Sequence, residues 1–341
     1  MTKRTAIFIS AGLVWGLSAC SVKEDSEAWV KADASGLSQT EDSVESALSE
    51  AQETEAQDVL PEVGEDALDL SLASKVLTDL PYGDTSERQK LDVYLPHGEA
   101  PYPTIFAIHG GGFMFGSKSG GGNTVIIESG LARGYAVIAV GYRLSGEAPF
   151  PVAVNDVQAA IVYAREQAQV MGLDDTRFVS WGGSAGGNLA AMVATKGSAE
   201  ENNHVQAAID WFGPIMFDAV DAQFEALGIE PKLGATSSAD SPESKYLGQT
   251  VGTLAAAELV IAASPQSYIT PDDPAIYIQH GSEDANVPLT QSQNFQDALR
   301  EVLGEEKVVF EVLDGAGHGG AEFEAPANLD KIYAFLEAQL K

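Results

Sequence analysis

Residues 181–187 read WGGSAGG, and this stretch decides the fold class. It contains the pattern G-x-S-x-G with Ser184 at its centre, between a predicted strand at residues 177–181 and a predicted helix at residues 189–195. In that context the serine lies on a strained turn that projects its hydroxyl from the sheet, and glycines two residues to either side let the backbone turn without Cβ clashes. The pattern therefore predicts a nucleophilic serine, with a glycine-rich helix cap as the alternative.

Strands and helices alternate on both sides of this segment. Nearly continuous apolar runs such as residues 104–109 and 135–141 are typical of buried parallel strands, and residues 152–168 have helical spacing. The alternation predicts an α/β fold with a mostly parallel central sheet and helices on both faces. Residues 213–264 fit this rhythm poorly, and we expect a small insertion over the C-terminal edge of the sheet. The other predicted strands are 90–95, 207–212, 275–279 and 307–313, and the other predicted helices are 289–303 and 329–340.

A second glycine-rich segment, HGGGF at residues 109–113, follows one of the predicted buried strands. Glycine backbone directed at a site supplies unhindered N–H donors for an oxyanion, and the amide after the nucleophile, that of Ala185, supplies another. The alternatives are a tight turn and a phosphate-binding loop. A phosphate cradle is poorly supported, because no helix N-terminus with a lysine follows the glycines.

The acid and the base are expected in the order serine, acid, histidine along the chain. Asp284 follows the predicted strand 275–279 by a short loop and is the preferred acid, with Glu283 and Asp314 as competitors. His318 lies on a glycine-rich loop after the last predicted strand, from which it can reach the serine. The alternatives are a surface turn for Asp284 and an exposed loop histidine for His318.

The remaining histidines are expected to have no catalytic role. His97 and His204 lie in predicted loops, and His280 is expected to shape the loop that carries the acid. No pair of histidines has the HxH or HExxH spacing of a metal site, and a single cysteine excludes a Cys-rich zinc site and an intrachain disulfide framework. We therefore expect neither a metal nor an organic cofactor.

These motifs resemble the α/β-hydrolase superfamily. More narrowly they resemble the HGGG carboxylesterases, which include the hormone-sensitive-lipase-like group and the bifunctional feruloyl/acetyl-xylan esterase group. The resemblance runs from about residue 90 to the C-terminus and includes LDVYLP at residues 91–96. Four further segments favour the feruloyl/acetyl-xylan group: GYRLSGEAPFP at 141–151, DWFGP at 210–214, SPESKYLG at 241–248 and HGSEDANVP at 280–288.

The resemblance implies an α/β-hydrolase fold and a set of site residues. The implied triad is Ser184, Asp284 and His318, and the implied oxyanion donors are Gly111, Gly112 and Ala185, with Gly110 as an alternative because the sequence does not fix the register. Two further matching positions, Arg143 and Asp156, are interpreted as a structural ion pair near the site. Gly183 departs from the pattern, since relatives often carry Glu or Asp there, and this weakens any inference about substrate.

The composition excludes several other functions. The 341 residues carry 19 Lys and Arg against 50 Asp and Glu, a formal net charge of −31. Binding of nucleic acid or of anionic lipid by charge needs clustered basic residues, so neither is expected. The acidic surface should also disfavour polyanionic substrates.

The N-terminal residues predict export and a lipid anchor. Lys3 and Arg4 precede an apolar stretch of about twelve residues, too short to span a bilayer, and residues 1–19 are interpreted as a signal peptide. The segment LSAC at residues 17–20 resembles the lipobox of bacterial lipoproteins, which predicts cleavage before Cys20 and lipidation of that cysteine, with an ordinary signal peptide as the alternative. We expect an extracytoplasmic protein, anchored by lipid in the outer membrane or facing the periplasm.

The region after Cys20 is expected to be a spacer. Residues 20–66 are acidic and rich in Ser, Ala, Glu and Gln, a composition that cannot bury enough apolar surface to order itself. They are interpreted as a flexible tether, and residues 67–341 as one catalytic domain.

Together these features predict a serine carboxylic-ester hydrolase that acts on short-acyl esters through an acyl-enzyme. Small esters, and acetyl or feruloyl groups on polysaccharide, are the candidate substrates. Two alternatives remain. One is a formamide or amide hydrolase that uses the same site. The other is a non-catalytic hydrolase fold that serves as a surface binding module. Oligomeric state is not readable from the sequence.

Overall fold

The computed structural model describes residues 68–120 and 122–341. The predicted signal peptide, the lipidation site Cys20 and the tether at residues 20–66 lie outside these residues. No helix in the described part of the chain has both the length and the apolar character needed to cross a membrane.

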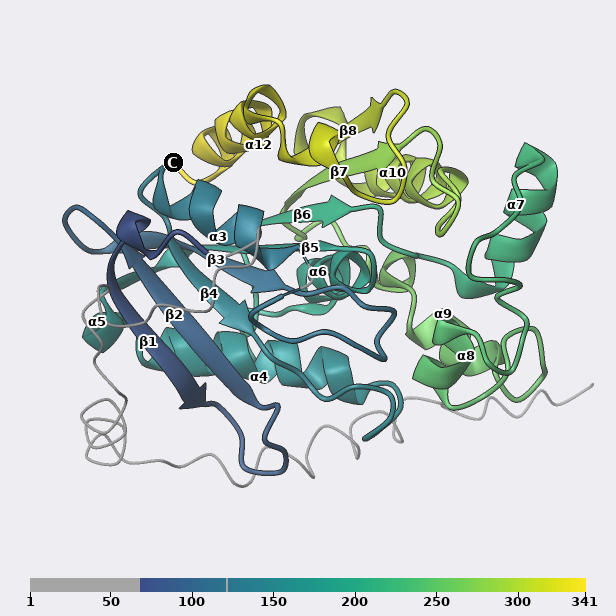
Figure 1. The fold of residues 1–341 in the computed structure, drawn as a ribbon, viewed down its shortest axis with the longest axis horizontal. Coiled ribbons are helices and arrows are strands. Elements are labelled where there is room, and N and C mark those ends of the chain that lie inside the picture. Colours follow the sequence, from purple (N-terminus) through teal and green to yellow (C-terminus); the bar gives the residue numbers. More distant parts are fainter. Residues whose placement is uncertain (1–67, 121) are drawn as a thin grey trace, which may run out of the picture. The chain divides into compact units, whose positions relative to one another are not determined.

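An eight-stranded sheet organises the described residues, in the order β1-β2-β4-β3-β5-β6-β7-β8 (Figure 1). The pairs from β4 to β8 are parallel, whereas β1 pairs with β2 and β2 with β4 in antiparallel fashion. The predicted mostly parallel sheet is confirmed. Its strands are β1 Ala73–Pro81, β2 Lys90–Pro96, β3 Tyr102–Ile108, β4 Ala136–Val140, β5 Leu173–Gly183, β6 Ala207–Trp211, β7 Ala275–Gly281 and β8 Val308–Leu313.

Helices cover both faces of the sheet, as predicted. The α-helices are α3 Asn123–Leu131, α4 Val152–Glu166, α5 Ala168–Met171, α6 Ala185–Lys196, α7 Val220–Leu227, α8 Pro242–Leu247, α9 Ala257–Ala262, α10 Thr290–Leu303, α11 Ala321–Glu324 and α12 Pro326–Gln339. Short 3₁₀ turns occupy Leu70–Leu72, Phe217–Ala219, Pro265–Tyr268 and Glu305–Lys307.

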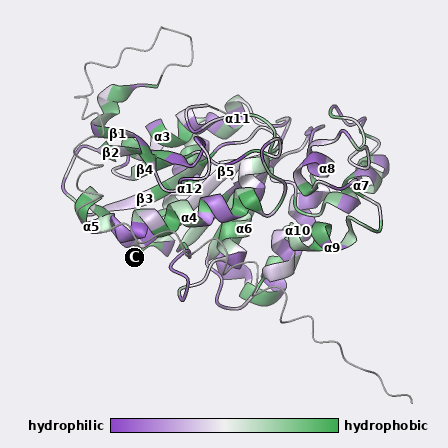
Figure 2. Ribbon diagram, turned by 90° about the horizontal axis from the view of Figure 1, so that it is seen from below, coloured by the Kyte–Doolittle hydropathy of each residue, from purple (hydrophilic) through white to green (hydrophobic). Residues whose placement is uncertain are grey.

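Side-chain alternation in the strands divides the core into two layers. In β3, Phe106 and Ile108 pack with α4, α6 and α10, whereas Ile105 and Ala107 pack with α3 and α12 on the opposite face. Successive side chains of a strand point to opposite faces, so a strand buried on both sides is apolar at every position. Helix α4 buries one side only and accordingly carries both hydrophobic and hydrophilic residues along its length (Figure 2), whereas α6 is buried on all sides.

The sequence did not predict β1, the short helices α3, α5, α7, α8, α9 and α11, or the observed starts of β5 and α6. The edge strand β1 has an irregular burial pattern and two register shifts against β2, so it lacks the alternation that marks a strand. Helix α3 follows the glycines of residues 120–122 and buries polar residues such as Asn123 and Ser129. Strand β5 begins at Leu173, four residues before the predicted start at Arg177, because its first half is polar and partly exposed.

The predicted insertion lies between β6 and β7 and contains α7, α8 and α9. Two contacts attach it to loops that follow the carboxyl ends of strands. Pro242 lies against Gly112 after β3. If Gly112 carried a Cβ, that atom would lie 3.1 Å from the Cβ of Pro242. The amide of Lys232 donates to the carbonyl of Ala285 after β7 at 2.8 Å. The insertion therefore borders the C-terminal edge of the sheet, as expected.

Candidate active site

Ser184 occupies the turn between β5 and α6. Its backbone has φ 58° and ψ −125°, a conformation that side-chain-bearing residues rarely adopt. The turn is held because the Ser184 amide donates to the carbonyl of Trp211 in β6 at 2.9 Å. The strain is thus offset by the surrounding sheet, and the hydroxyl is placed at the carboxyl end of β5.

The glycines on either side of the serine are required by close backbone contacts. A Cβ on Gly186 would lie 2.1 Å from the carbonyl oxygen of Ile108, and a Cβ on Gly182 would lie 2.4 Å from the backbone of Gly186. Both distances are far inside van der Waals contact with backbone atoms that cannot rotate away. The predicted reason for these glycines, room for a sharp turn, is confirmed.

His318 lies between the serine and an acid. Its Nε2 is 2.8 Å from Ser184 Oγ, and its Nδ1 is 2.8 Å from Asp284 Oδ2. The serine follows β5, the acid follows β7 and the histidine follows β8, so three strands of the same half of the sheet, with β6 between β5 and β7, deliver the three side chains (Figure 1). A carboxylate can only accept, so Nδ1 carries a proton and Nε2 is free to accept the serine proton.

Both carboxylate oxygens of Asp284 accept hydrogen bonds. Its Oδ1 accepts from the amides of Asn286 at 2.8 Å and Val287 at 3.0 Å, and its Oδ2 contacts His318. Burial raises the pKa of this carboxyl, but the hydrogen bonds from His280 and His318 outweigh burial and hold the pKa well below its usual range. Asp284 is therefore ionised wherever His318 can act as a base.

The two competing acids are placed differently. Glu283 and Asp314 are both exposed, and neither side chain contacts His318. The structure therefore brings Asp284, and not its competitors, to the histidine.

His280 is fully buried behind the acid. Its Nε2 lies 2.9 Å from the carbonyl oxygen of Val287 and 3.3 Å from Asp284 Oδ2, and its Nδ1 lies 2.7 Å from Ser292 Oγ. Both partners of Nε2 are acceptors, so Nε2 carries the proton and Nδ1 accepts from the serine hydroxyl. His280 thus holds the acid loop and the acid itself, in agreement with the shaping role expected from the sequence.

The glycine-rich loop after β3 presents its backbone to the serine. Gly111 and Gly112 have φ 113° and 59°, and a Cβ on Gly111 would lie 2.3 Å from the carbonyl oxygen of Phe115. Neither amide donates to another described residue, and the Ala185 amide opens α6, where amides have no partner within the helix. These three groups border the same cavity as Ser184, as does Gly110.

Several contacts fix the conformation of this loop. Phe113 also has positive φ, 58°, and its carbonyl accepts from the amide of Ser145 at 2.8 Å. Its ring stacks on Tyr246 of α8 with centroids 3.8 Å apart. Tyr142 donates its hydroxyl to the carbonyl of His109 at 2.7 Å and stacks on the His109 ring. Burial lowers the pKa of His109 to about 4, so this ring is neutral at neutral pH and supports the loop as packing.

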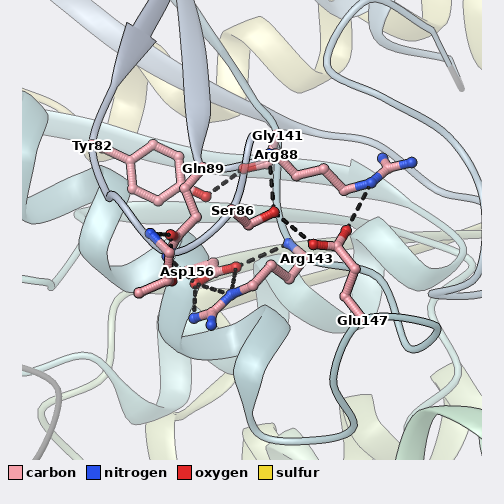
Figure 3. Close-up of polar contacts among 9 residues, drawn as sticks. Tyr82, Ser86, Arg88, Gln89, Gly141, Arg143, Glu147 and Asp156 are labelled. Carbon is pink, nitrogen blue, oxygen red and sulfur yellow. Dashed lines mark hydrogen bonds and ion pairs between the residues drawn. The ribbon is translucent and has the colours of Figure 1, made fainter.

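Behind that loop lies a polar network with the buried Asp156 at its centre, drawn in Figure 3. Asp156 accepts from the Arg143 backbone amide at 2.9 Å and from its guanidinium at 2.7 Å and 2.9 Å, and Gln89 donates to it at 2.9 Å. Arg88 pairs with Glu147 at 3.0 Å and donates to the carbonyl of Gly116. The predicted structural ion pair of Arg143 and Asp156 is confirmed, and it anchors the segment that hydrogen-bonds the glycine-rich loop.

The cavity at the serine has a volume of about 470 Å³. Most of its wall is apolar, and its charged residues are acidic, Glu243 at 8% exposure and the exposed Glu324. The ring of Phe212 lies 4.6 Å from that of His318, and a Cβ on Gly183 would lie 3.1 Å from Phe212. A small residue at position 183 therefore leaves room for this ring.

Sequence reasoning missed Phe212 and Glu243 as lining residues of the cavity. Both lie in segments already quoted, DWFGP and SPESKYLG. The place of Glu243 depends on how the insertion folds back, and that of Phe212 on the turn directly after β6, and local pattern specifies neither. In the described part of the chain, no group of three or more His, Cys, Asp or Glu side chains could hold a metal ion.

Comparison with known proteins identifies a family model and several curated esterases that match this chain. The BD-FAE family model matches residues 91–299. The "Probable carboxylic ester hydrolase LipM" of Mycobacterium tuberculosis is 27% identical over 252 residues, which are 70% of this chain and 55% of LipM. This chain thus spans little more than half the length of LipM, and the same holds for two further curated relatives, the esterases LipQ and LipC of the same organism.

Two solved structures resemble the described fold. One is described as "Truncated form of carbohydrate esterase from gut microbiota", with a TM-score of 0.69, 27% identity and coverage of 79% of this chain and 97% of that chain. The other is a bifunctional GH43-CE protein of Bacteroides eggerthii, with a TM-score of 0.67, 28% identity and coverage of 78% of this chain and 35% of that chain.

Proposed function

The chain belongs to the BD-FAE family of the α/β-hydrolase class, and we propose that it is a serine carboxylic-ester hydrolase with Ser184 as nucleophile, His318 as base and Asp284 as the acid that orients it. The observation that carries the proposal is the unbroken chain of two 2.8 Å contacts from Ser184 through His318 to Asp284. It begins at a strained turn and lies beside free backbone amides, which is the arrangement that acyl transfer needs.

Acylation follows from this geometry. As Ser184 Oγ forms a bond to the ester carbonyl carbon, its proton passes to His318 Nε2, and Asp284 stabilises the imidazolium that results. The carbonyl electron pair moves onto oxygen, and the amides of Gly111, Gly112 and Ala185 are the proposed donors to it. When the tetrahedral species collapses, the bond to the alcohol oxygen breaks and His318 returns the proton to that oxygen.

Deacylation repeats these steps with water. His318 removes a proton from the water as its oxygen bonds to the acyl carbon. Collapse then breaks the bond to Ser184 Oγ, which takes the proton back, and the free acid leaves. Protonated His318 cannot act as a base, so activity should fall at acidic pH.

Short acyl esters are the proposed substrates, with acetyl or feruloyl groups on polysaccharide as candidates. A cavity of about 470 Å³ suits a small acyl group, and its glutamates are unfavourable partners for a long alkyl chain. The similarity to a structure described as a carbohydrate esterase supports the same candidates.

Hydrolysis of 4-nitrophenyl esters of graded acyl length tests the proposal, with the full chain and its Ser184→Ala variant. Fast turnover of the acetate, decreasing with chain length and absent in the variant, is expected. Equal activity of the variant would contradict the assignment of Ser184. Activity on formamides but not on esters would favour the amide-hydrolase alternative, and no activity in the wild type would favour a binding module.

We also propose that the protein is extracytoplasmic and anchored by lipid at Cys20. The support is the sequence alone: the only cysteine of the chain lies at the position that a lipobox requires. Metabolic labelling with an alkyne fatty acid should mark the wild-type protein in its natural host and leave Cys20→Ser unmarked. Labelling of Cys20→Ser would contradict the anchor site.

A further inference from the structure

Glu243 places a buried carboxyl in the wall of the active-site cavity. The residue is 8% exposed and borders the same cavity as Ser184 and His318. Apart from its own backbone amide, its side chain has no hydrogen-bond or ion-pair partner among the described residues. Buried polar groups in folded proteins almost always have partners, so a carboxyl that faces a cavity without a protein partner is available to a polar group of a ligand.

A second unpaired polar side chain belongs to the same wall. Asn286 also borders the cavity, two residues after the catalytic acid, and its side-chain amide has no partner among the described residues. The insertion holds the wall in place: Pro242, next to Glu243, lies against Gly112, and the backbone of Lys232 is hydrogen-bonded to that of Ala285, next to Asn286. The wall therefore runs between the oxyanion loop and the acid loop, in the same cavity as Ser184.

The surroundings of Glu243 favour a partner that can both donate and accept a hydrogen bond. Neither Lys nor Arg occurs among the described residues that border the cavity. Burial, and secondarily the like charge of Asp221, raise the pKa of Glu243 to about 7, so the neutral and ionised forms coexist at neutral pH. A hydroxyl can pair with either form, because it both donates and accepts, whereas a cation pairs only with the ionised form.

We propose that Glu243 and Asn286 form a specificity-determining subsite that hydrogen-bonds a free hydroxyl of the substrate close to the scissile ester. The inference rests on the proposed esterase function and deepens it. The subsite favours esters of alcohols that carry further free hydroxyls over esters of alcohols with a single hydroxyl.

The test compares glycerol 1-monoacetate with its dimethyl ether, in which both free hydroxyls are methylated and can no longer donate a hydrogen bond. The full chain, Glu243→Leu and Glu243→Gln are measured, and 4-nitrophenyl acetate serves as a reference for basal chemistry. The wild type should prefer the monoacetate. Glu243→Leu should lower kcat/KM for the monoacetate about tenfold and change that for the dimethyl ether and the reference ester less than about threefold, as expected for one lost hydrogen bond.

Two further variants sharpen the comparison. Glu243→Gln keeps a donor and an acceptor and should retain most of the preference. Asn286→Ala should shift the preference in the same direction as Glu243→Leu, and it keeps the inference testable if Glu243→Leu fails to fold. Glu225→Gln is the matched control, because this glutamate is exposed on α7 of the same insertion and does not border the cavity.

Each adverse result has a distinct meaning. An unchanged preference in Glu243→Leu overturns the subsite while the reference activity leaves the esterase intact. A preference for acetylcholine over the monoacetate that is lost in Glu243→Gln overturns it in favour of a cation site. Absence of any hydrolysis by the wild type, the reference ester included, overturns the proposed function and the subsite with it.

Discussion

Replacing Asp284 by Asn should almost abolish catalysis without removing the acid's shape. Four donors surround the carboxylate: the amides of Asn286 and Val287 at Oδ1, and His318 and His280 at Oδ2. The backbone amides cannot become acceptors, so the Asn oxygen must face them and its NH₂ must face the histidines. His318 then has to accept at Nδ1 and carry its proton on Nε2, where it can no longer take the proton of the serine.

The expected loss in kcat is on the order of 10⁴-fold, the scale seen when a triad histidine is held in the wrong tautomer, which corresponds to about 5 kcal/mol in activation free energy. Initial rates on 4-nitrophenyl acetate would measure it, with Glu283→Gln and Asp314→Asn as matched controls that should stay near wild type. A loss of less than about tenfold in Asp284→Asn, or a comparable loss in either control, would refute the assignment of the acid.

Further predictions concern the turn, a buried acid and the oxyanion loop. Gly186→Ala places a methyl 2.1 Å from a backbone oxygen and should strongly reduce the Tm, whereas Gly146→Ala meets no atom within 4 Å and should be tolerated. Burial raises the pKa of Asp210 to about 6, above its unfolded value, so the contribution of this group to stability should be lost as pH rises from the unfolded to the folded pKa. In urea unfolding across that range, the wild type should lose about 3 kcal/mol more free energy of unfolding than Asp210→Asn, and equal losses would contradict the prediction. Tyr142→Phe removes the hydroxyl bonded to the oxyanion loop and should cost about 1 kcal/mol of stability together with a reduced kcat; a variant equal to wild type in both would show that this contact is dispensable.

Much of the sheet could be predicted because its signals are local. Residues 104–109 and 135–141 are apolar at nearly every position, which follows directly from burial on both faces. The turn at Ser184 could also be predicted, because its glycines are required by close contacts within the motif and with the neighbouring strand. Strand β1 could not, because an edge strand with register shifts buries too few residues in alternation.

The choice of acid shows where sequence reasoning ends. Glu283 and Asp284 are adjacent in the chain, and only the direction in which each side chain leaves the loop separates them. That direction is set by contacts of Asp284 with the amides of Asn286 and Val287 and with His280. Such contacts depend on the folded loop and cannot be read from the composition of the segment. Glu243 was missed for a related reason, since its place at the cavity depends on how the insertion packs against Gly112.

Trapping the covalent intermediate tests the central claim most directly. The full chain and Ser184→Ala would be treated with a fluorophosphonate that stays bonded to nucleophilic serines, and the peptides would be mapped by mass spectrometry. We predict one adduct, on the peptide that contains Ser184, a parallel loss of 4-nitrophenyl acetate hydrolysis, and no adduct in the variant. An adduct on another residue, or full inhibition without an adduct at Ser184, would contradict the proposed mechanism.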